Sequence, residues 1–162
     1  MTTYSLKEGT HYSLHLPKFC YNRKELDVEV RFHKTCWFPL ILPDDYAINK
    51  LVGWSFGRHH KNSFRCGWRP AGKEGYIDLF FYIYNDGERF EKFLATIQCG
   101  NTYGFKMKWH PEGCISIGAS EKEVLVGGIF FNKAPKLGYF LFPYFGGKNP
   151  TPHDMKIDLD FK

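Results

Sequence analysis

The chain has 162 residues, a formal net charge of +5, and 43% hydrophobic and 19% aromatic residues. This length suits one domain with a sizeable hydrophobic core. Its 22 lysines and arginines are scattered rather than grouped in a basic block, which argues against a nucleic-acid partner. No apolar run approaches the roughly 20 residues of a membrane-spanning helix, so no membrane partner is expected.

The N-terminal region has no basic stretch followed by an apolar run, which predicts a protein without a secretory signal peptide. We therefore expect a cytoplasmic protein, or a virion protein if a phage encodes the chain. The five cysteines are an odd number and include no Cys-x-x-Cys pair. This pattern is typical of reduced, buried thiols rather than of a zinc site or a disulfide framework.

Short alternating segments predict β-strands in the N-terminal half. Within residues 25–32, apolar and charged side chains alternate strictly, as in a half-buried strand. Residues 36–42 form an apolar run broken by Pro39 and closed by Pro43, which fits an edge strand or a covering loop. Acidic residues then precede a helical turn predicted over residues 45–49. The other strands expected in this half cover residues 4–6, 11–16, 51–56 and 64–68.

Three consecutive strands are predicted between Tyr76 and Trp109, over residues 76–84, 89–98 and 102–109. The turns between them, Asn85-Asp86-Gly87 and Gly100-Asn101, contain residues that tolerate positive φ and therefore suit tight hairpins. The last of these strands has one apolar and one polar face. Further strands are predicted over residues 114–119, 123–126, 129–131, 138–142 and 155–161.

Many short strands without a long helix predict an all-β, single-domain antiparallel β-sandwich with at most one short helical turn. The order of features from Asn62 to Trp109 resembles the concanavalin A-like lectin and glucanase sandwich, a jelly roll. These features are a strand with Phe64, Arg65 and Gly67, an aromatic strand, and an Asn-Asp-Gly hairpin. The segment 143–154 also resembles the C-terminal tails of small β-sandwich proteins of bacteria and their phages.

Residues 25–29 have the form Glu-x-Asp-x-Glu and resemble the active-site strand of retaining endo-glucanases of the laminarinase and lichenase type. Alternation along a strand puts Glu25, Asp27 and Glu29 on one face. The resemblance implies that Glu25 is the nucleophile, Glu29 the acid/base, and Asp27 the residue that tunes them. The other interpretation is a solvated charged strand, with Lys24 and Arg31 as ion-pair partners.

The connection between residues 56 and 64 is polar and basic. Arg58, His59, His60, Lys61 and Arg65 could contact an acidic glycan or a protein partner there. No third ligand lies close in sequence to the two histidines, so no metal site is predicted from them.

Tryptophan faces stack on sugar rings, so a tryptophan exposed at the surface is a candidate sugar-binding residue. Trp54, Trp68 and Trp109 lie in alternating apolar patterns and are expected in the core, whereas Trp37, close to Pro39, is expected at the surface as a binding residue.

No cofactor is predicted. If the lectin resemblance holds, Ca²⁺ is the ion that suits it, because carboxylate and carbonyl oxygens in loops are calcium ligands. The available residues are Asp44, Asp45, Asn85 and Asp86, and they do not form a known calcium loop.

Two functions are compatible with these features. The first is a non-catalytic β-sandwich that binds or assembles, either as a carbohydrate-recognition module or as a virion or appendage component. This reading favours a carbohydrate or protein partner and a homo-oligomer or larger assembly. The alternative is a glycan-cleaving endo-glycosidase that uses Glu25, Asp27 and Glu29.

Overall fold

The computed structural model describes residues 1–15, 18–109, 115–119, 122–126 and 136–162. Within these ranges, the side chains of residues 44, 109, 115–119 and 122–126 lie outside the description. The strand predicted over residues 129–131 therefore falls outside the described residues, and so do Cys114 and the side chain of Trp109.

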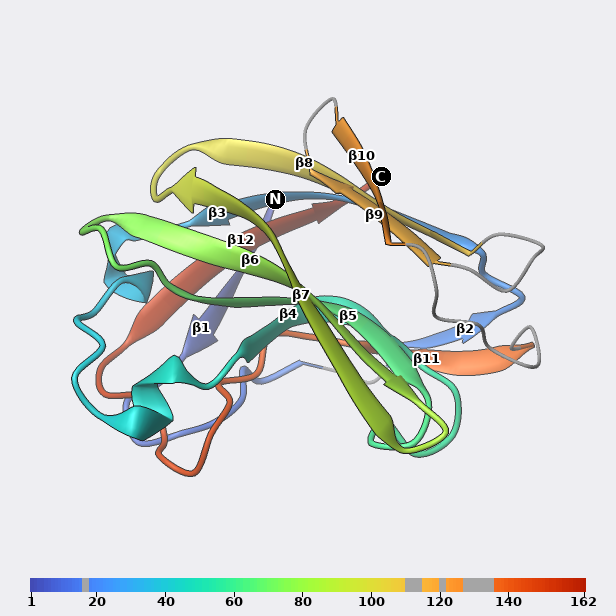
Figure 1. The fold of residues 1–162 in the computed structure, drawn as a ribbon, viewed down its shortest axis with the longest axis horizontal. Coiled ribbons are helices and arrows are strands. Elements are labelled where there is room, and N and C mark those ends of the chain that lie inside the picture. The colour runs from blue at the N-terminus through green and yellow to red at the C-terminus, as the bar shows by residue number, and fades with distance from the viewer. Residues whose placement is uncertain (16–17, 110–114, 120–121, 127–135) are drawn as a thin grey trace.

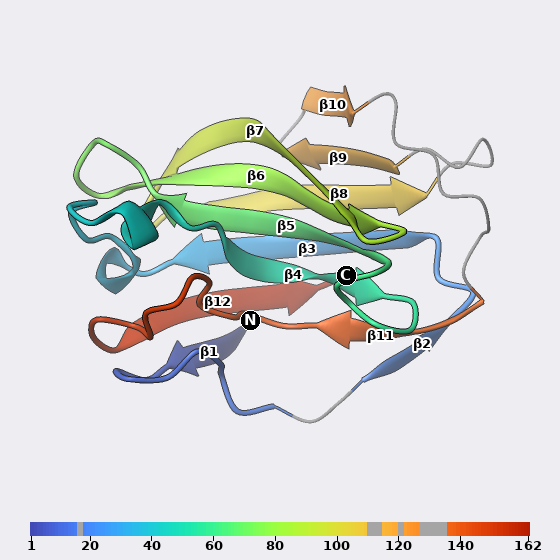
Figure 2. The ribbon, with the colours of Figure 1, turned by 60° about the horizontal axis from the view of Figure 1, so that its bottom comes forward.

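The described chain forms two six-stranded antiparallel sheets packed face to face (Figure 1). Sheet A contains, in spatial order, β1 (Thr2–Leu6), β12 (Met155–Phe161), β3 (Glu25–Phe32), β8 (Thr102–Trp109), β9 (Ile115–Ala119) and β10 (Lys122–Val126). Sheet B contains β2 (Phe19–Tyr21), β11 (Leu137–Leu141), β4 (Asn49–Ser55), β5 (Ser63–Pro70), β6 (Tyr76–Asn85) and β7 (Glu88–Gln98). Figure 2 shows sheet B nearer the viewer, with its strands in this order from bottom to top.

The core lies between the sheets because the apolar residues of each alternating strand point inward. In β3 the residues at even positions, from Leu26 to Phe32, are buried, while the odd positions carry the charged side chains. Phe32 of sheet A meets Trp68 of sheet B with ring centroids 5.2 Å apart, so the two layers are in direct aromatic contact. Trp54 and Trp68 are fully buried, as their apolar surroundings in the sequence predict.

The hairpin between β6 and β7 closes through Asp86 and Gly87, which have φ values of 52° and 94°. Asn85 pairs with Glu88, so the loop contains only these two residues. Positive φ at both positions is the condition for a tight turn that matches the twist of the strands. The turn predicted from Asn85-Asp86-Gly87 is therefore present, and it fixes the register of the two longest strands.

Four segments differ from the sequence-based expectation. Residues 11–15 are not a strand, because only Tyr12 forms a bridge, to Tyr144. The expected run 36–42 is mainly a loop, preceded by a 3₁₀ turn, η1 (Lys34–Cys36). The helical turn comes earlier than predicted, as η2 (Pro43–Tyr46), because proline suits the first position of a helical turn. The three-residue strand β2 is too short to give an alternating pattern.

The all-β antiparallel sandwich predicted from the sequence is confirmed. Beyond the two 3₁₀ turns, the described residues contain no helix. None of the helices in the described part of the chain is long and apolar enough to cross a bilayer.

Two glycines give the outer face of sheet B its shape. A Cβ on Gly53 would lie 2.1 Å from the carbonyl oxygen of Phe64 and 2.8 Å from Cγ of Arg65. A Cβ on Gly67 would lie 2.4 Å from a methyl group of Ile48. These positions need glycine because neighbouring groups occupy the space above them.

We expect Gly53→Ala to lower the free energy of unfolding by about 3 kcal/mol or more, since the added methyl group overlaps backbone atoms that cannot move aside. Gly104→Ala in β8 is the matched control, because nothing lies within 4 Å of its added Cβ. Urea unfolding of the two variants measures the difference. Equal stabilities would show that sheet B relaxes around residue 53.

Candidate functional site

The register of sheet B places Gly53, Arg65, Tyr82 and Glu91 side by side on four adjacent strands. Directly paired residues of antiparallel strands share one face, and these side chains lie on the outer face, away from the core. The next row contains Tyr139, Ser55, Ser63, Tyr84 and Arg89. The outer face of sheet B therefore gathers basic and phenolic side chains from strands far apart in the sequence.

Arg65 is buried although it lies on the outer face of a sheet. Only 5% of it is exposed, and its guanidinium carbon lies 5.3 Å from the centroid of the Tyr82 ring. Its Nε and Nη2 atoms have no hydrogen-bond partner among the described residues. A buried cation without a partner is unfavourable, and a carboxylate is the partner that matches guanidinium geometry with two parallel hydrogen bonds. The uncompensated charge of Arg65 therefore favours an anion beside it.

A pocket of about 450 Å³ opens beside Arg65. Its walls come from β4, β5 and the histidine loop between them, from β11 and the segment after it, and from the N-terminal segment. The lining residues are Tyr12, His15, Lys50, His59, His60, Arg65, Tyr139, Phe140, Leu141, Phe142, Pro143 and Tyr144. This size and this mixture of aromatic and basic groups suit a small polar ligand or one part of a polymer.

Lys50 adds a second, half-buried cation to the pocket. Its Nζ donates a hydrogen bond to the carbonyl oxygen of Ile48 at 2.8 Å and lies 4.8 Å from the centroid of the Tyr82 ring. Burial, together with the positive charge of Arg65, lowers the pKa of Lys50 to about 8. Burial also raises the pKa of Tyr82 to about 12, so its phenol stays neutral and does not compensate either cation.

His59, His60 and Tyr139 lie at the same pocket. The hydroxyl of Tyr139 is 3.4 Å from Nδ1 of His59, and the two imidazole rings are 4.2 Å apart. Burial, His60 and Arg65 all lower the pKa of His59, so its ring is neutral near pH 7. A neutral imidazole in contact with a phenol can accept a proton and pass one on.

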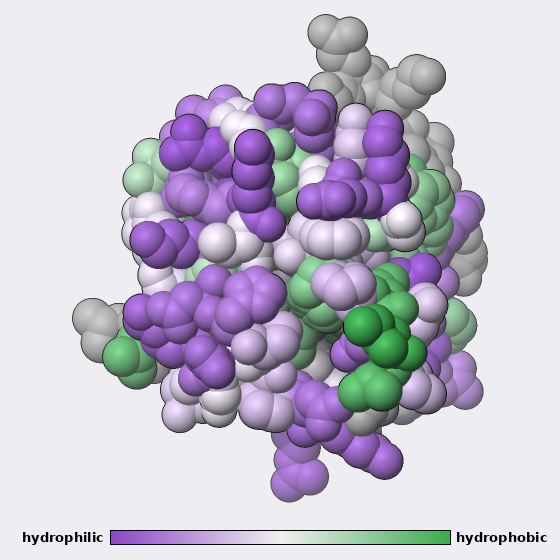
Figure 3. Space-filling view, turned by 90° about the vertical axis from the view of Figure 1, so that its left-hand side faces the viewer, coloured by the Kyte–Doolittle hydropathy of each residue, from purple (hydrophilic) through white to green (hydrophobic). Residues whose placement is uncertain are grey.

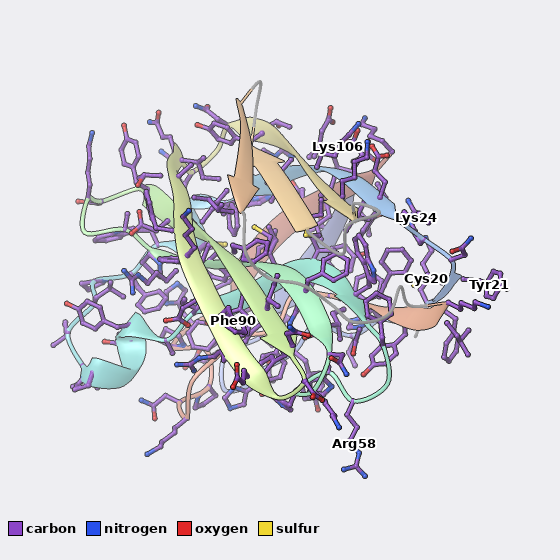
Figure 4. All side chains as sticks on the ribbon, turned by 45° about the vertical axis from the view of Figure 1, so that its right-hand side comes forward. Cys20, Tyr21, Lys24, Arg58, Phe90 and Lys106 are labelled. Carbon is purple, nitrogen blue, oxygen red and sulfur yellow. The ribbon has the colours of Figure 1, made fainter. Side chains whose placement is uncertain are left out.

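The three carboxylates Glu25, Asp27 and Glu29 lie on the outer face of sheet A, on the opposite side of the molecule. Lys106 pairs with Glu25 at 2.9 Å and with Asp27 at 3.3 Å, and Lys162 pairs with Glu29 at 3.2 Å. Figure 4 shows Lys106 and Arg58 at opposite sides of the ribbon.

The ion pairs on sheet A bear on the endo-glycosidase hypothesis. The hydrogen bond from Lys106 lowers the pKa of Glu25 and keeps it ionised, as a nucleophile requires, but the same lysine occupies this carboxylate in an ion pair. The pairing partners also differ from the expected Lys24 and Arg31: Arg31 binds Asp158, with N–O distances of 2.9 and 2.6 Å.

Trp37 lies away from the histidine pocket. It is half-buried rather than exposed, and its indole N–H donates to the carbonyl oxygen of Ala71 at 3.1 Å. It lines a second pocket, of about 490 Å³, together with Phe38, Phe145 and His153. The loop at this end carries the exposed side chains of Ile41 and Leu42, on a side of the molecule that is mostly hydrophilic with a compact hydrophobic patch (Figure 3).

The remaining predicted residues do not converge on one site. Arg58 extends away from the body of the protein (Figure 4), and Lys61 pairs with Asp86 at 3.4 Å. Asp45 accepts hydrogen bonds from the N–H groups of Ile41 and Leu42, which holds the loop before η2. The side chain of Asp44 lies outside the described residues. Within the described part of the chain, no three His, Cys, Asp or Glu side chains form a group that could hold a metal ion.

No protein-family model matches the sequence, and no curated protein matches it. Solved structures do match. An alginate lyase from Pseudomonas aeruginosa aligns with a TM-score of 0.57 and 10% identity over 88% of this chain and 66% of its own. One from Klebsiella pneumoniae aligns with a TM-score of 0.58 and 10% identity over 85% of this chain and 59% of its own.

A third match is a family 7 alginate lyase crystallised with its substrate, in which a histidine and a tyrosine are substituted. It aligns with a TM-score of 0.53 and 10% identity over 94% of this chain and 67% of its own. The chain has a concanavalin A-like jelly-roll fold. This fold agrees with the resemblance seen between Asn62 and Trp109. The chain spans less than two thirds of the length of the first two lyases.

These matches correct one interpretation of the sequence. We had expected a non-catalytic module, either a carbohydrate-recognition protein or a virion or appendage component, but the similar structures are mainly enzymes that cleave polysaccharides. This expectation was wrong because it rested on the many aromatic residues and on the lack of a compelling catalytic constellation in the sequence. The pocket of sheet B joins residues from several strands instead.

Of the residues gathered here, the sequence predicted His59, His60 and Arg65 as binding residues but not Lys50, Tyr82 and Tyr139. Lys50 is the one charged residue of β4, which is a usable signal. Tyr82 belongs to a strand that is aromatic on both faces, so alternation could not assign it. Tyr139 reaches the site only because β11 pairs with β4, a contact between distant segments.

Lys50→Met tests the electrostatic strain in the pocket. The pKa of Lys50 is about 8 in the folded protein, below its unfolded value, so the ammonium destabilises the fold below about pH 8. This penalty disappears as the pH rises from about 8 to the unfolded pKa of about 10.4. We expect Lys50→Met to be more stable than the wild type by roughly 2 kcal/mol at pH 7 and nearly equal at pH 10.

Urea unfolding at the two pH values gives both differences. Lys148→Met, which replaces an exposed lysine, is the control. A stability difference for Lys50→Met that is the same at both pH values would contradict the assigned burial of the charge.

Proposed function

We propose that this chain is a lyase that cleaves uronate-containing polysaccharides by β-elimination at the pocket on the outer face of sheet B. The observation that carries the proposal is the buried guanidinium of Arg65, whose Nε and Nη2 lack partners among the described residues. A sugar carboxylate would supply the missing anion. The similarity of the fold to alginate lyases supports the same substrate class.

The elimination needs three chemical tasks. A base removes the proton from C5, the carbon that bears the carboxylate, and the electron pair forms a C4–C5 double bond. The C4–O4 bond breaks, and the leaving oxygen takes up a proton. No water is consumed, and the products are a new reducing end and an unsaturated uronate. Arg65 and Lys50 would stabilise the negative charge that develops on the carboxylate as the C5 proton leaves.

His59 and Tyr139 fit the proton-transfer tasks. The lowered pKa of His59 keeps its ring available as the base, while the Tyr139 hydroxyl, 3.4 Å from the His59 ring, can protonate the leaving oxygen. The family 7 lyase whose substrate complex has both a histidine and a tyrosine substituted supports a pair of this kind. Tyr82 holds Arg65 in place from the other side.

The first test is incubation of the purified chain with alginate, polygalacturonate and the neutral glucan laminarin. We expect ultraviolet absorbance from the conjugated double bond with an anionic polymer and none with laminarin. Arg65→Ala should lower kcat/KM by about a hundredfold to a thousandfold, the typical effect of removing a group that stabilises transition-state charge. Arg58→Ala, in the exposed loop beside it, should remain close to the wild type.

Two results would overturn the proposal. One is cleavage that yields reducing ends without the double bond, because hydrolysis and not elimination would then be the reaction. The other is an Arg65→Ala variant that cleaves anionic polymers as fast as the wild type.

The triple variant Glu25→Gln, Asp27→Asn, Glu29→Gln separates this proposal from the endo-glycosidase alternative. We expect its kcat/KM to stay within about twofold of the wild type. These carboxylates pair with Lys106 and Lys162 on the outer face of sheet A, whereas the proposed active site lies on sheet B. Activity on all three polymers is measured with the same absorbance and reducing-end assays. Loss of reducing-end formation in the triple variant alone would place catalysis on β3.

A further inference from the structure

A row of residues crosses the outer face of four strands of sheet B, β4 to β7, and continues through Tyr144 to the N-terminal segment. Each member pairs with the next in the register of the strands or through an isolated bridge. From one side to the other, the row contains Tyr12, Tyr144, Lys50, Gly67, Phe80 and Phe93. Its five strand-to-strand steps span about 24 Å, since neighbouring strands lie about 4.8 Å apart.

The two ends of this row are exposed aromatic side chains. Tyr12 is 60% exposed, Tyr144 40% and Phe93 52%. Single exposed apolar residues are ordinary on protein surfaces, but here they stand in line on both sides of the cations Lys50 and Arg65. Between them, Ile48 lies over Gly67, and the guanidinium carbon of Arg69 lies 4.8 Å from the centroid of the buried Phe80 ring, which adds a cation to the middle of the row. The row has a charged centre and an aromatic platform at each end.

Tyr12 is held in position although it does not belong to a strand. The residues next to the Tyr12–Tyr144 bridge hold it. Phe145 donates its N–H to the carbonyl oxygen of His11 at 2.7 Å, and the His11 and Tyr144 rings stack with their centroids 5.7 Å apart. The ring of His15 contacts Phe142 at 4.2 Å. Because this backbone is already fixed, binding a ligand at Tyr12 does not have to order the loop.

We propose that this row binds an extended anionic glycan across the strands, with sugar rings stacked on Tyr12 and Tyr144 at one side and on Phe93 at the other. The inference rests on the proposed function and deepens it, because it assigns subsites that flank the cleaved bond. Charge complementarity selects the occupant: the cations Lys50, Arg65 and Arg69 favour a polyanion. Aromatic faces suit the apolar faces of its rings. The enzyme therefore prefers long oligosaccharides.

Binding is measured on a His59→Ala background, so that cleavage does not remove the ligand. Isothermal titration calorimetry compares an alginate trisaccharide with an alginate hexasaccharide. Adding Tyr12→Ala or Phe93→Ala should weaken hexasaccharide binding about tenfold, equivalent to about 1.4 kcal/mol, and trisaccharide binding much less. Tyr21→Ala is the matched control, because this tyrosine is 74% exposed but lies on β2 at the far end of the molecule (Figure 4).

The outcomes separate this inference from the proposed function. If wild-type protein cleaves anionic polymers but Tyr12→Ala and Phe93→Ala bind the hexasaccharide as tightly as their parent, the row is not a binding site and the lyase proposal stands. If the hexasaccharide binds in a Tyr12- and Phe93-dependent manner without cleavage by the wild type, the row is a binding site and the lyase proposal fails. No binding of the hexasaccharide overturns the inference. Equal thermal unfolding of all variants confirms that they are folded.

Discussion

Arg65 is buried on the outside of a sheet, and much of sheet B is arranged around that fact. Gly53 and Gly67 carry no side chains because Arg65 and Ile48 occupy the space above them. Tyr82 lies against the guanidinium on the next strand, and its neutral phenol leaves the charge uncompensated. The nearby Lys50 is forced toward its neutral form. The folded protein thus tolerates a local electrostatic penalty that an anionic ligand can relieve, a common relation between stability and function.

The charged side chains on the outer faces of the two sheets have different surroundings. On sheet A the charges are matched: Asp158 is nearly buried, and hydrogen bonds from Thr3, Arg31 and His33 outweigh the effect of burial and lower its pKa to about 2. On sheet B the cations of the pocket face phenols and each other. The acidic pattern of residues 25–29 therefore lies on sheet A, where the charges are paired. The outer face of sheet B, where the cations of the pocket lack acidic ion-pair partners among the described residues, has no conspicuous sequence motif.

Local patterns predicted what depends on neighbours in sequence. The alternation in residues 25–32 and the Asn85-Asp86-Gly87 turn specify β3 and the longest hairpin, and both are present. The pocket depends on pairing between distant segments: Tyr12 with Tyr144, and Tyr144 with Lys50. Alternation says which residues share a face of one strand but not which strand lies next to it. His59 and Arg65 could be named in advance because they are close in sequence, but Lys50 and Tyr139 could not.

The position of β12 has a consequence for how the chain folds. This last strand lies in sheet A between β1 and β3, so it joins residues as far apart as Thr3 and Asp158. Until β12 has been synthesised, β1 has no partner in the sheet and β3 presents an open edge. Contacts of such long sequence separation form slowly, and an unpaired edge is prone to aggregate. During translation, sheet A therefore stays open at β3 until β12 has left the ribosome.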